Sequence, residues 1–89
     1  MENREKIKKK LTADGYATIY EYDDGPGEKF SEHSHEGEQL MFIMAGEMKV
    51  EMNGKTYRLK FGDSLLFPAN ALHSAKIGAQ GCSYIVGEK

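Results

Sequence analysis

Two alternating segments joined by Asn53-Gly54 constrain the fold of this chain more than any other feature. Apolar and polar side chains alternate over residues 48–52 and again over residues 56–61. Alternation with a period of two is typical of a strand that buries one face. Asn-Gly is the pair that best tolerates the positive φ angles of a type I′ turn. The sequence therefore predicts a β-hairpin around this pair, with Phe61 on the apolar face of its second strand.

Similar segments surround the hairpin on both sides. Stretches rich in β-branched and aromatic residues are separated by clusters of glycine, proline, asparagine and aspartate. The expected strands are residues 17–22, 28–35, 39–45, 48–52, 56–61, 64–67, 71–77 and 82–86. Gly46 is expected to end one strand, and Gly78 and Gly81 to separate the last two. Many short strands with regular turns predict an all-β sandwich or barrel.

The first residues differ from the rest of the chain. Residues 1–14 are expected to form a helical or frayed segment, followed by a β domain over residues 15–89. Ile7 and Leu11 are four residues apart and share one helix face. The run of lysines at 8–10 is interpreted as a solvated face rather than a nucleic-acid patch, because no basic or aromatic pattern continues it.

The segment from Leu40 to Met44 is apolar at every position. A strand that is apolar on both faces is covered on both. One face is expected to point into the domain and the other to meet a partner subunit. A chain of this length buries only about 60% of its unfolded surface. A homodimer that covers further apolar area is therefore expected.

Composition narrows the possible settings of the protein. The 89 residues suit one domain, and the net charge of −2 argues neither for nor against a polyanionic partner. No stretch of about 18 apolar residues is present, and the charged N-terminus has no apolar core of a secretory signal. The single Cys82 has no internal disulfide partner. These features predict a cytoplasmic protein without nucleic-acid or membrane partners.

Two histidines, His33 and His35, are separated by one residue and share one face of an extended strand. Neutral imidazole is the commonest protein metal ligand and suits zinc, copper, iron and nickel. A straight strand would carry Gln39 about 13 Å beyond His35. The chain is therefore expected to fold back at Gly37, where glycine makes this easy. The strand register then turns Gln39 inward and Glu38 toward solvent.

Two motifs in the chain resemble those of the cupin family. The first consists of Gly27, His33, His35, Gln39 and Gly46, with glutamine where the family has glutamate. The second consists of Gly62, Pro68, Asn70, His73 and Ile77, with asparagine in place of glycine and isoleucine in place of asparagine. Asparagine tolerates a left-handed conformation, so the tight turn is expected to be kept. The resemblance implies a double-stranded β-helix, the jelly-roll cupin barrel, over about residues 17–86.

The resemblance also implies a metal held by His33, His35, Gln39 and His73. The ion would be a divalent transition metal: iron, copper, nickel, cobalt, zinc or manganese. The alternative is a cupin that has lost its metal and kept its pocket. The neutral amide of Gln39 leaves the charge of an ion uncompensated, so hard ions are expected to bind less well. Glutamine at position 39 also replaces the glutamate that many cupins are thought to use as a base.

Two functions follow from the resemblance. One is a metal-dependent enzyme, with dioxygenase-type chemistry on a small organic molecule as the leading hypothesis. The other is a non-catalytic module that binds a small molecule or sugar, and a vestigial metal protein is a third alternative, because one scaffold hosts many functions. No catalytic residue is identified. The expected pocket walls are Met41, Ile43, Ala71 and Ala75, with Tyr84 of undefined face and Cys82 as a structural thiol.

Overall fold

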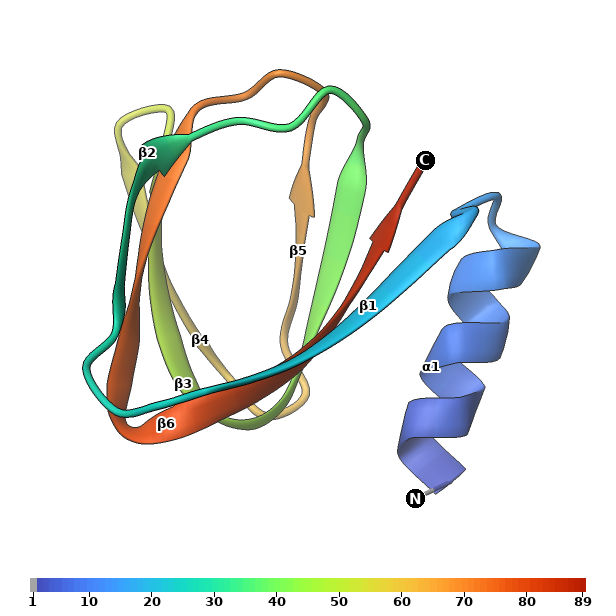
Figure 1. Cartoon of the computed structure of the whole chain (residues 1–89), viewed down its shortest axis with the longest axis horizontal. Helices are drawn as coiled ribbons and strands as arrows, with labels where there is room; N and C mark the ends of the chain where they lie inside the picture. The colour runs from blue at the N-terminus through green and yellow to red at the C-terminus, as the bar shows by residue number, and fades with distance from the viewer. Residues whose placement is uncertain (1) are drawn as a thin grey trace.

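The computed structural model describes residues 2–89, which form one helix and six strands (Figure 1). These are α1 (Glu2–Ala13), β1 (Thr18–Asp24), β2 (Lys29–His33), β3 (Gln39–Met52), β4 (Lys55–Lys60), β5 (Ser64–Phe67) and β6 (His73–Glu88). The predicted all-β fold with a short N-terminal helix is confirmed. In this described part of the chain, the helix is neither long nor apolar enough to cross a membrane.

The long strands β3 and β6 organise the sheet. They pair antiparallel from Gln39 opposite Glu88 to Met52 opposite His73. Strands β1 and β5 flank one half of this ribbon, and β2 and β4 flank the other half. The ribbon bends in its middle, so that the two halves face each other (Figure 1). The result is the jelly roll that the resemblance of the two motifs implies.

The bend lies where Gly46 and Gly81 meet. A break at each of these glycines was predicted, and this was wrong, because β3 and β6 are continuous through them. Both glycines have positive φ, 77° and 78°, and irregularities interrupt the pairing on both sides of Gly46. A Cβ atom on Gly46 would lie 2.0 Å from the carbonyl oxygen of Gly81. Glycine therefore bends each strand without ending it.

The predicted hairpin is confirmed. Asn53 and Gly54 both have positive φ, 55° and 76°, and β4 returns along β3. The expected position of Phe61 was wrong. The strand ends at Lys60, and the following turn leaves the Phe61 side chain 61% exposed. Alternation therefore predicted the strand correctly but not its last residue.

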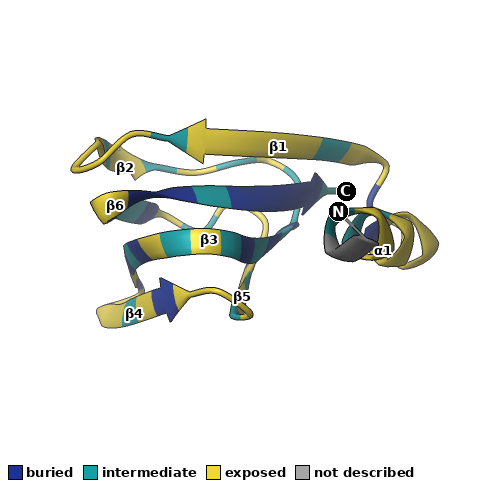
Figure 2. Ribbon diagram, turned by 90° about the horizontal axis from the view of Figure 1, so that it is seen from below, coloured by how far each residue is buried: buried dark blue, intermediate teal, exposed yellow. Residues whose placement is uncertain are grey.

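The core lies between the two halves of the sheet. Its buried members are Met41, Ile43, Met48, Val50, Met52, Leu59, Phe67, Ile77, Cys82, Tyr84 and Val86. Most of them come from β3 and β6, and Figure 2 shows a long buried stretch on β6, burial that varies along β3 and an exposed β1. The central strands are therefore covered by neighbours, while β1 is an edge.

Helix α1 packs on the outer face of the sheet. Leu11 of the helix packs against Tyr16 and Ile85, and all three side chains are buried. The outward side chains of residues 40, 42 and 44 pack against this cluster. The face of β3 that was expected to meet a partner subunit is thus covered by the chain's own helix. The homodimer and the cytoplasmic setting stay predictions.

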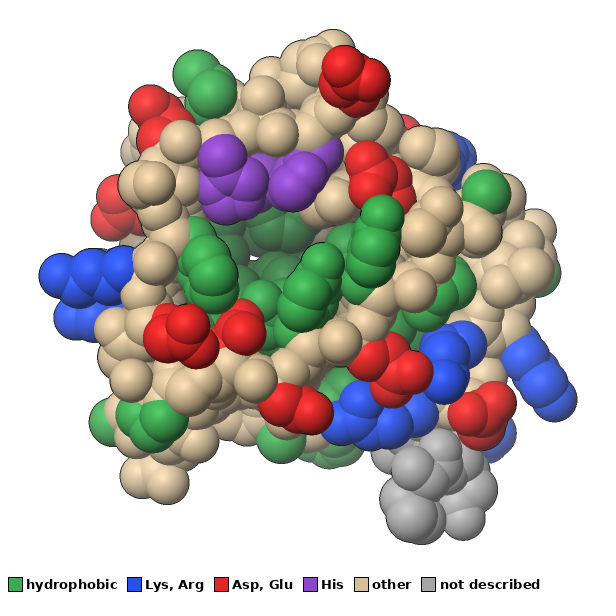
Figure 3. All heavy atoms as spheres, in the orientation of Figure 1, with side chains coloured by type: hydrophobic (Ala, Val, Ile, Leu, Met, Phe, Trp, Pro, Cys, Tyr) green, Lys and Arg blue, Asp and Glu red, His purple; other side chains and the backbone are tan. Residues whose placement is uncertain are grey.

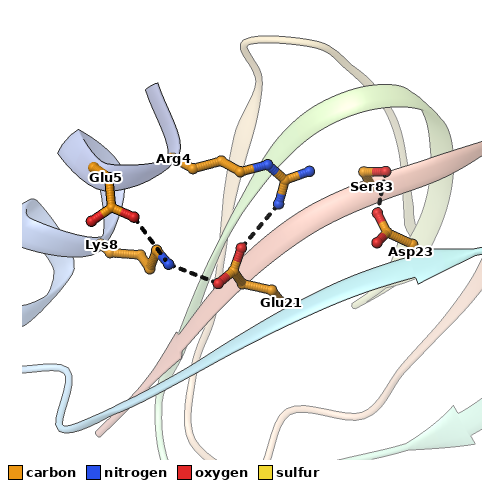
Figure 4. Close-up of polar contacts among 6 residues, drawn as sticks. All are labelled: Arg4, Glu5, Lys8, Glu21, Asp23 and Ser83. Atoms are coloured by element: carbon orange, nitrogen blue, oxygen red, sulfur yellow. Dashed lines mark hydrogen bonds and ion pairs between the residues drawn. The ribbon is translucent and has the colours of Figure 1, made fainter. Parts of the chain in front are cut away.

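Ion pairs hold the helix against β1 (Figure 4). Arg4 contacts Glu21 at 3.0 Å, and Lys8 contacts the same carboxylate at 2.8 Å and Glu5 at 3.4 Å. Lys10 pairs with Asp14 at 2.8 Å. The lysine run thus contributes charges that are already partly paired within the chain, which agrees with a solvated helix face.

The bend generates a stability prediction. Gly46→Ala should lower the free energy of unfolding by at least about 3 kcal/mol. The new Cβ atom would clash with the Gly81 backbone, and alanine disfavours the positive φ of this position. Gly62→Ala is the matched control, because Gly62 has φ +91° but open space around its Cβ. It should lose only about 1–2 kcal/mol. Urea unfolding of both variants checks this, and equal losses would contradict it.

Candidate metal centre

The three histidines meet at one edge of the molecule. His33 ends β2, His35 follows it in the connection to β3, and His73 begins β6, directly opposite His33. Their ring centroids are 4.4 to 5.4 Å apart. One ring nitrogen from each lies within 4.8 Å of the other two. The tertiary structure therefore brings together all three histidines that the sequence singled out.

This spacing fits a metal ion. Zinc–nitrogen bonds are about 2.0–2.1 Å long, so two nitrogens on one ion are at most about 4.2 Å apart. The nitrogens of His33, His35 and His73 are within 4.8 Å of one another, so small ring rotations would bring them onto one ion. Three imidazoles are the donor set of a catalytic type of site that leaves a position open. These three side chains can hold a metal.

Backbone carbonyls orient two of the rings. His33 Nδ1 lies 2.7 Å from the Ser31 carbonyl oxygen, and His73 Nδ1 lies 3.1 Å from the Ala71 carbonyl oxygen. A carbonyl only accepts, so each Nδ1 must carry the hydrogen, and Nε2 keeps its lone pair. Burial lowers the pKa of His73, with the neighbouring histidines adding to this effect and the Ala71 bond opposing it. The lowered pKa favours the neutral form of the His73 ring, which is the form that binds a metal.

The turn after Pro68 connects the two motif loops. Asn70 has φ +63°, and its N–H donates to the His35 carbonyl oxygen at 2.7 Å. The prediction that asparagine keeps this turn is confirmed. The chain bends at Glu36 and Gly37 before Gln39, as expected. A Cβ on Gly37 would lie 2.2 Å from the Lys89 carbonyl oxygen, so close packing also requires glycine at this bend.

Gln39 faces inward as predicted, with 8% of its surface exposed. Its amide Nε2 donates to the Glu88 carboxylate at 3.4 Å. A carboxylate only accepts, so Glu88 favours the orientation that leaves the amide oxygen of Gln39 for the interior. Glu38 faces the other way, but its expected solvent exposure was only partly right. The Tyr16 hydroxyl donates to Glu38 at 2.7 Å, and Lys89 lies 3.7 Å from it.

A cavity of about 290 Å³ adjoins the histidines. Figure 3 shows the histidine side chains above a hollow lined by hydrophobic side chains. The cavity is lined by Tyr22, Asp24, Phe30, His33, His35, Gln39, Met41, Met48, Val50, Phe67, His73, Ala75, Tyr84 and Val86. Met41 and Ala75 are walls, as predicted. Ile43 and Ala71 instead pack in or against the core. The site therefore combines a nitrogen-rich edge with an apolar interior.

Sequence reasoning missed the polar group at another part of this cavity. The Tyr84 hydroxyl donates to the Asp24 carboxylate, and burial and this bond raise the Tyr84 pKa. Tyr22 lines the same region. The strand expected over residues 17–22 stopped short of Asp24, although the spacing of Tyr20, Tyr22 and Asp24 by two residues could have placed them on one strand face. Cys82 is a buried thiol whose pKa burial raises to about 11, which agrees with a structural role.

The chain is similar to known proteins over most of its length. The sequence profile of the family described as "Cupin domain" matches residues 20–86. A nitrosourea synthase from Streptomyces achromogenes subsp. streptozoticus is 34% identical over 59 residues, which are 65% of this chain and 12% of that protein. The chain therefore corresponds to only a small part of that relative.

Solved structures share the fold. An RmlC-like cupin from Shewanella frigidimarina superposes with a TM-score of 0.71 at 22% identity, covering 80% of this chain and 64% of the other. The DMSP lyase DddQ from Ruegeria pomeroyi superposes with a TM-score of 0.70 at 25% identity, covering 80% of this chain and 37% of the other. The likeness concerns the barrel and not the remainder of the longer proteins.

The orientation of the rings generates a spectroscopic prediction. In metal-free protein above pH 8, His33 and His73 should both be in the tautomer with hydrogen on Nδ1, because each donates to a carbonyl. Long-range ¹H–¹⁵N spectra of labelled histidine check this. His35 is the internal control, because no hydrogen bond to its ring occurs among the described residues. Hydrogen on Nε2 of either predicted ring would contradict the assignment.

Proposed function

The chain belongs to the cupin family, and we propose that it binds a divalent transition metal and acts on a small organic molecule in the adjoining cavity. The ligands are the imidazoles of His33, His35 and His73, with the amide oxygen of Gln39 as the fourth donor. One observation carries the proposal: three ring nitrogens from separate parts of the chain lie within 4.8 Å of one another beside a cavity.

The residues at the proposed metal site favour redox or Lewis-acid chemistry over abstraction of a proton by a motif carboxylate. Iron, copper, nickel, cobalt, zinc or manganese would supply that chemistry, and neutral nitrogen donors favour the softer of these ions. The motif carboxylate that could accept a proton is replaced by Gln39. We therefore propose a dioxygenase-type oxidoreductase, with binding of a small molecule without turnover as the competing outcome.

The remaining residues of the site hold and shield the substrate. Phe67 packs against the His73 ring, with centroids 4.5 Å apart, and both are buried. Apolar side chains such as Met41 and Val86 form the walls beyond the rings. A site of this kind keeps water away from a bound molecule and strengthens the electrostatic interactions inside.

Metal binding is the first test. Addition of Co²⁺, Ni²⁺ or Zn²⁺ to metal-free protein should stabilise it, by about 2.7 kcal/mol when free metal exceeds the dissociation constant a hundredfold. His33→Gln and His73→Gln should lose this stabilisation. Ser34→Ala, between two of the ligands but exposed, should keep it. Thermal unfolding and elemental analysis provide the measurement.

The outcomes of this test separate the candidate functions. Bound redox metal with oxygen uptake in the presence of small diphenols or diketones supports the enzyme. Bound metal without uptake, together with stabilisation by a sugar or an organic acid, supports the binding module. Protein that takes up no metal with the native histidines would overturn the proposal.

The amide at position 39 generates a prediction about metal preference. Gln39→Glu should raise affinity for Mn²⁺ relative to Ni²⁺ by about tenfold, because a carboxylate suits harder ions. The metal-free variant should unfold at a lower temperature, because its new carboxylate lies beside that of Glu88. Gln80→Glu adds the same charge at an exposed position and is the control. Competition titrations measure the preference, and an unchanged ratio of affinities would count against the role of Gln39.

A further inference from the structure

We propose that Asp24, Tyr22 and Tyr84 form a subsite for an organic cation, such as an ammonium or guanidinium group, in the cavity that the histidines border. This inference deepens the proposed function and rests on it only for the role of the metal. The subsite predicts a small molecule with a positively charged nitrogen at one end and a metal-binding oxygen group at the other.

The first observation is an uncompensated carboxylate in an apolar cavity. Asp24 lines the cavity and is half-buried. Its one hydrogen-bond donor among the described residues is the Tyr84 hydroxyl, and no lysine, arginine or histidine of that part of the chain forms an ion pair with it. A carboxylate has two oxygens with about four acceptor positions. Asp24 therefore keeps acceptor capacity and a full negative charge for a ligand.

The second observation is the pair of aromatic rings beside this carboxylate. The ring centroids of Tyr22 and Tyr84 are 5.1 Å apart, and both side chains line the cavity. The faces of aromatic rings attract cations, and the attraction grows when the site is shielded from water. Tyr20 stacks on Tyr22 with a centroid distance of 6.1 Å. The aromatic surface thus continues along the inner face of β1 to the exposed rim.

The third observation is the sign of the surrounding charge. Burial raises the pKa of Tyr22, and the neighbouring Tyr20, Asp24 and Glu88 add to this effect. Burial, with a further contribution from Asp24, also raises the pKa of Tyr84 and of the Cys82 thiol. A neutral sugar would leave this negative charge unpaired, whereas a cation would neutralise it. Charge therefore favours a cation over a sugar at this place.

The two polar parts of the cavity come from different places in the fold. Asp24 pairs with Cys82 beside the bend in the middle of β6, whereas His33 and His73 lie together where β6 begins. Apolar side chains such as Met48 and Val50 also line the cavity. A volume of about 290 Å³ is at the lower limit of ligand pockets. The arrangement suits one small molecule with two different polar groups.

The test compares choline with its neutral isostere 3,3-dimethyl-1-butanol. Both are titrated into metal-free and Zn²⁺-loaded protein, and binding is followed by amide chemical shifts. Choline should bind at least about fivefold more tightly than the alcohol, with shifts around residues 22, 24 and 84. Equal binding of the two probes, or binding of glucose but not of choline, would overturn the proposal.

Two aspartate variants separate a binding role from a structural one. Asp24→Asn keeps an acceptor for the Tyr84 hydroxyl but removes the charge, and it should abolish the preference for choline. Asp23→Asn is the matched control, because Asp23 lies next in the chain but accepts from Ser83 on the outer face (Figure 4). It should retain the preference. Loss of the preference in both variants would contradict the subsite, and Tyr22→Leu, which should weaken choline binding, tests it independently of Asp24.

One further variant keeps the two proposals distinguishable. His73→Gln should lose Zn²⁺ and still prefer choline to the alcohol. Protein that binds choline but no metal would overturn the proposed function and leave the subsite standing. Protein that binds metal but shows no preference for choline would overturn the subsite and leave the metal site standing.

Discussion

The bend of the β3–β6 ribbon is the constraint on which the rest of the structure depends. The two strands pair along their full length, and the close approach of the Gly46 and Gly81 backbones lets both of them bend at one place. Folding the ribbon back brings its ends toward each other. His73 lies at one end and Gln39 at the other. Folding this single pair of long strands places Gln39 and His73 near each other, and the pairing of β2 with β6 brings His33 beside His73.

Local backbone contacts then set the chemistry at the ends of the ribbon. Carbonyl groups two residues away hold the rings of His33 and His73, and Asn70 ties one motif loop to the other. A backbone group does not titrate, so these contacts orient the imidazoles without adding charge. The buried Gln39 amide is also neutral. The proposed ligands at the edge of the cavity are therefore all neutral, while the carboxylates of Glu88, which accepts from Gln39, and Asp24 lie outside this ligand set.

Because the domain is small, apolar burial on the outer face of the sheet contributes to its stability. The core between the two halves contains a cavity, so part of the interior is not filled by side chains. Helix α1 adds a second apolar layer through Leu11 and Ile85, and its ion pairs to Glu21 hold it in register with β1. Burial on the outer face thus adds to the stability that the core between the two halves supplies.

The sequence by itself determined the hairpin at Asn53-Gly54 and the pair His33 and His35, because turn chemistry and spacing are local properties, and the family resemblance added His73. Tertiary structure alone decided that Gly46 and Gly81 bend strands instead of ending them, since a glycine's role depends on which backbone approaches it. It also decided that Tyr22, Asp24 and Tyr84 share a cavity with the histidines. Their contacts join residues about 60 positions apart, and no local pattern encodes which strands will be neighbours.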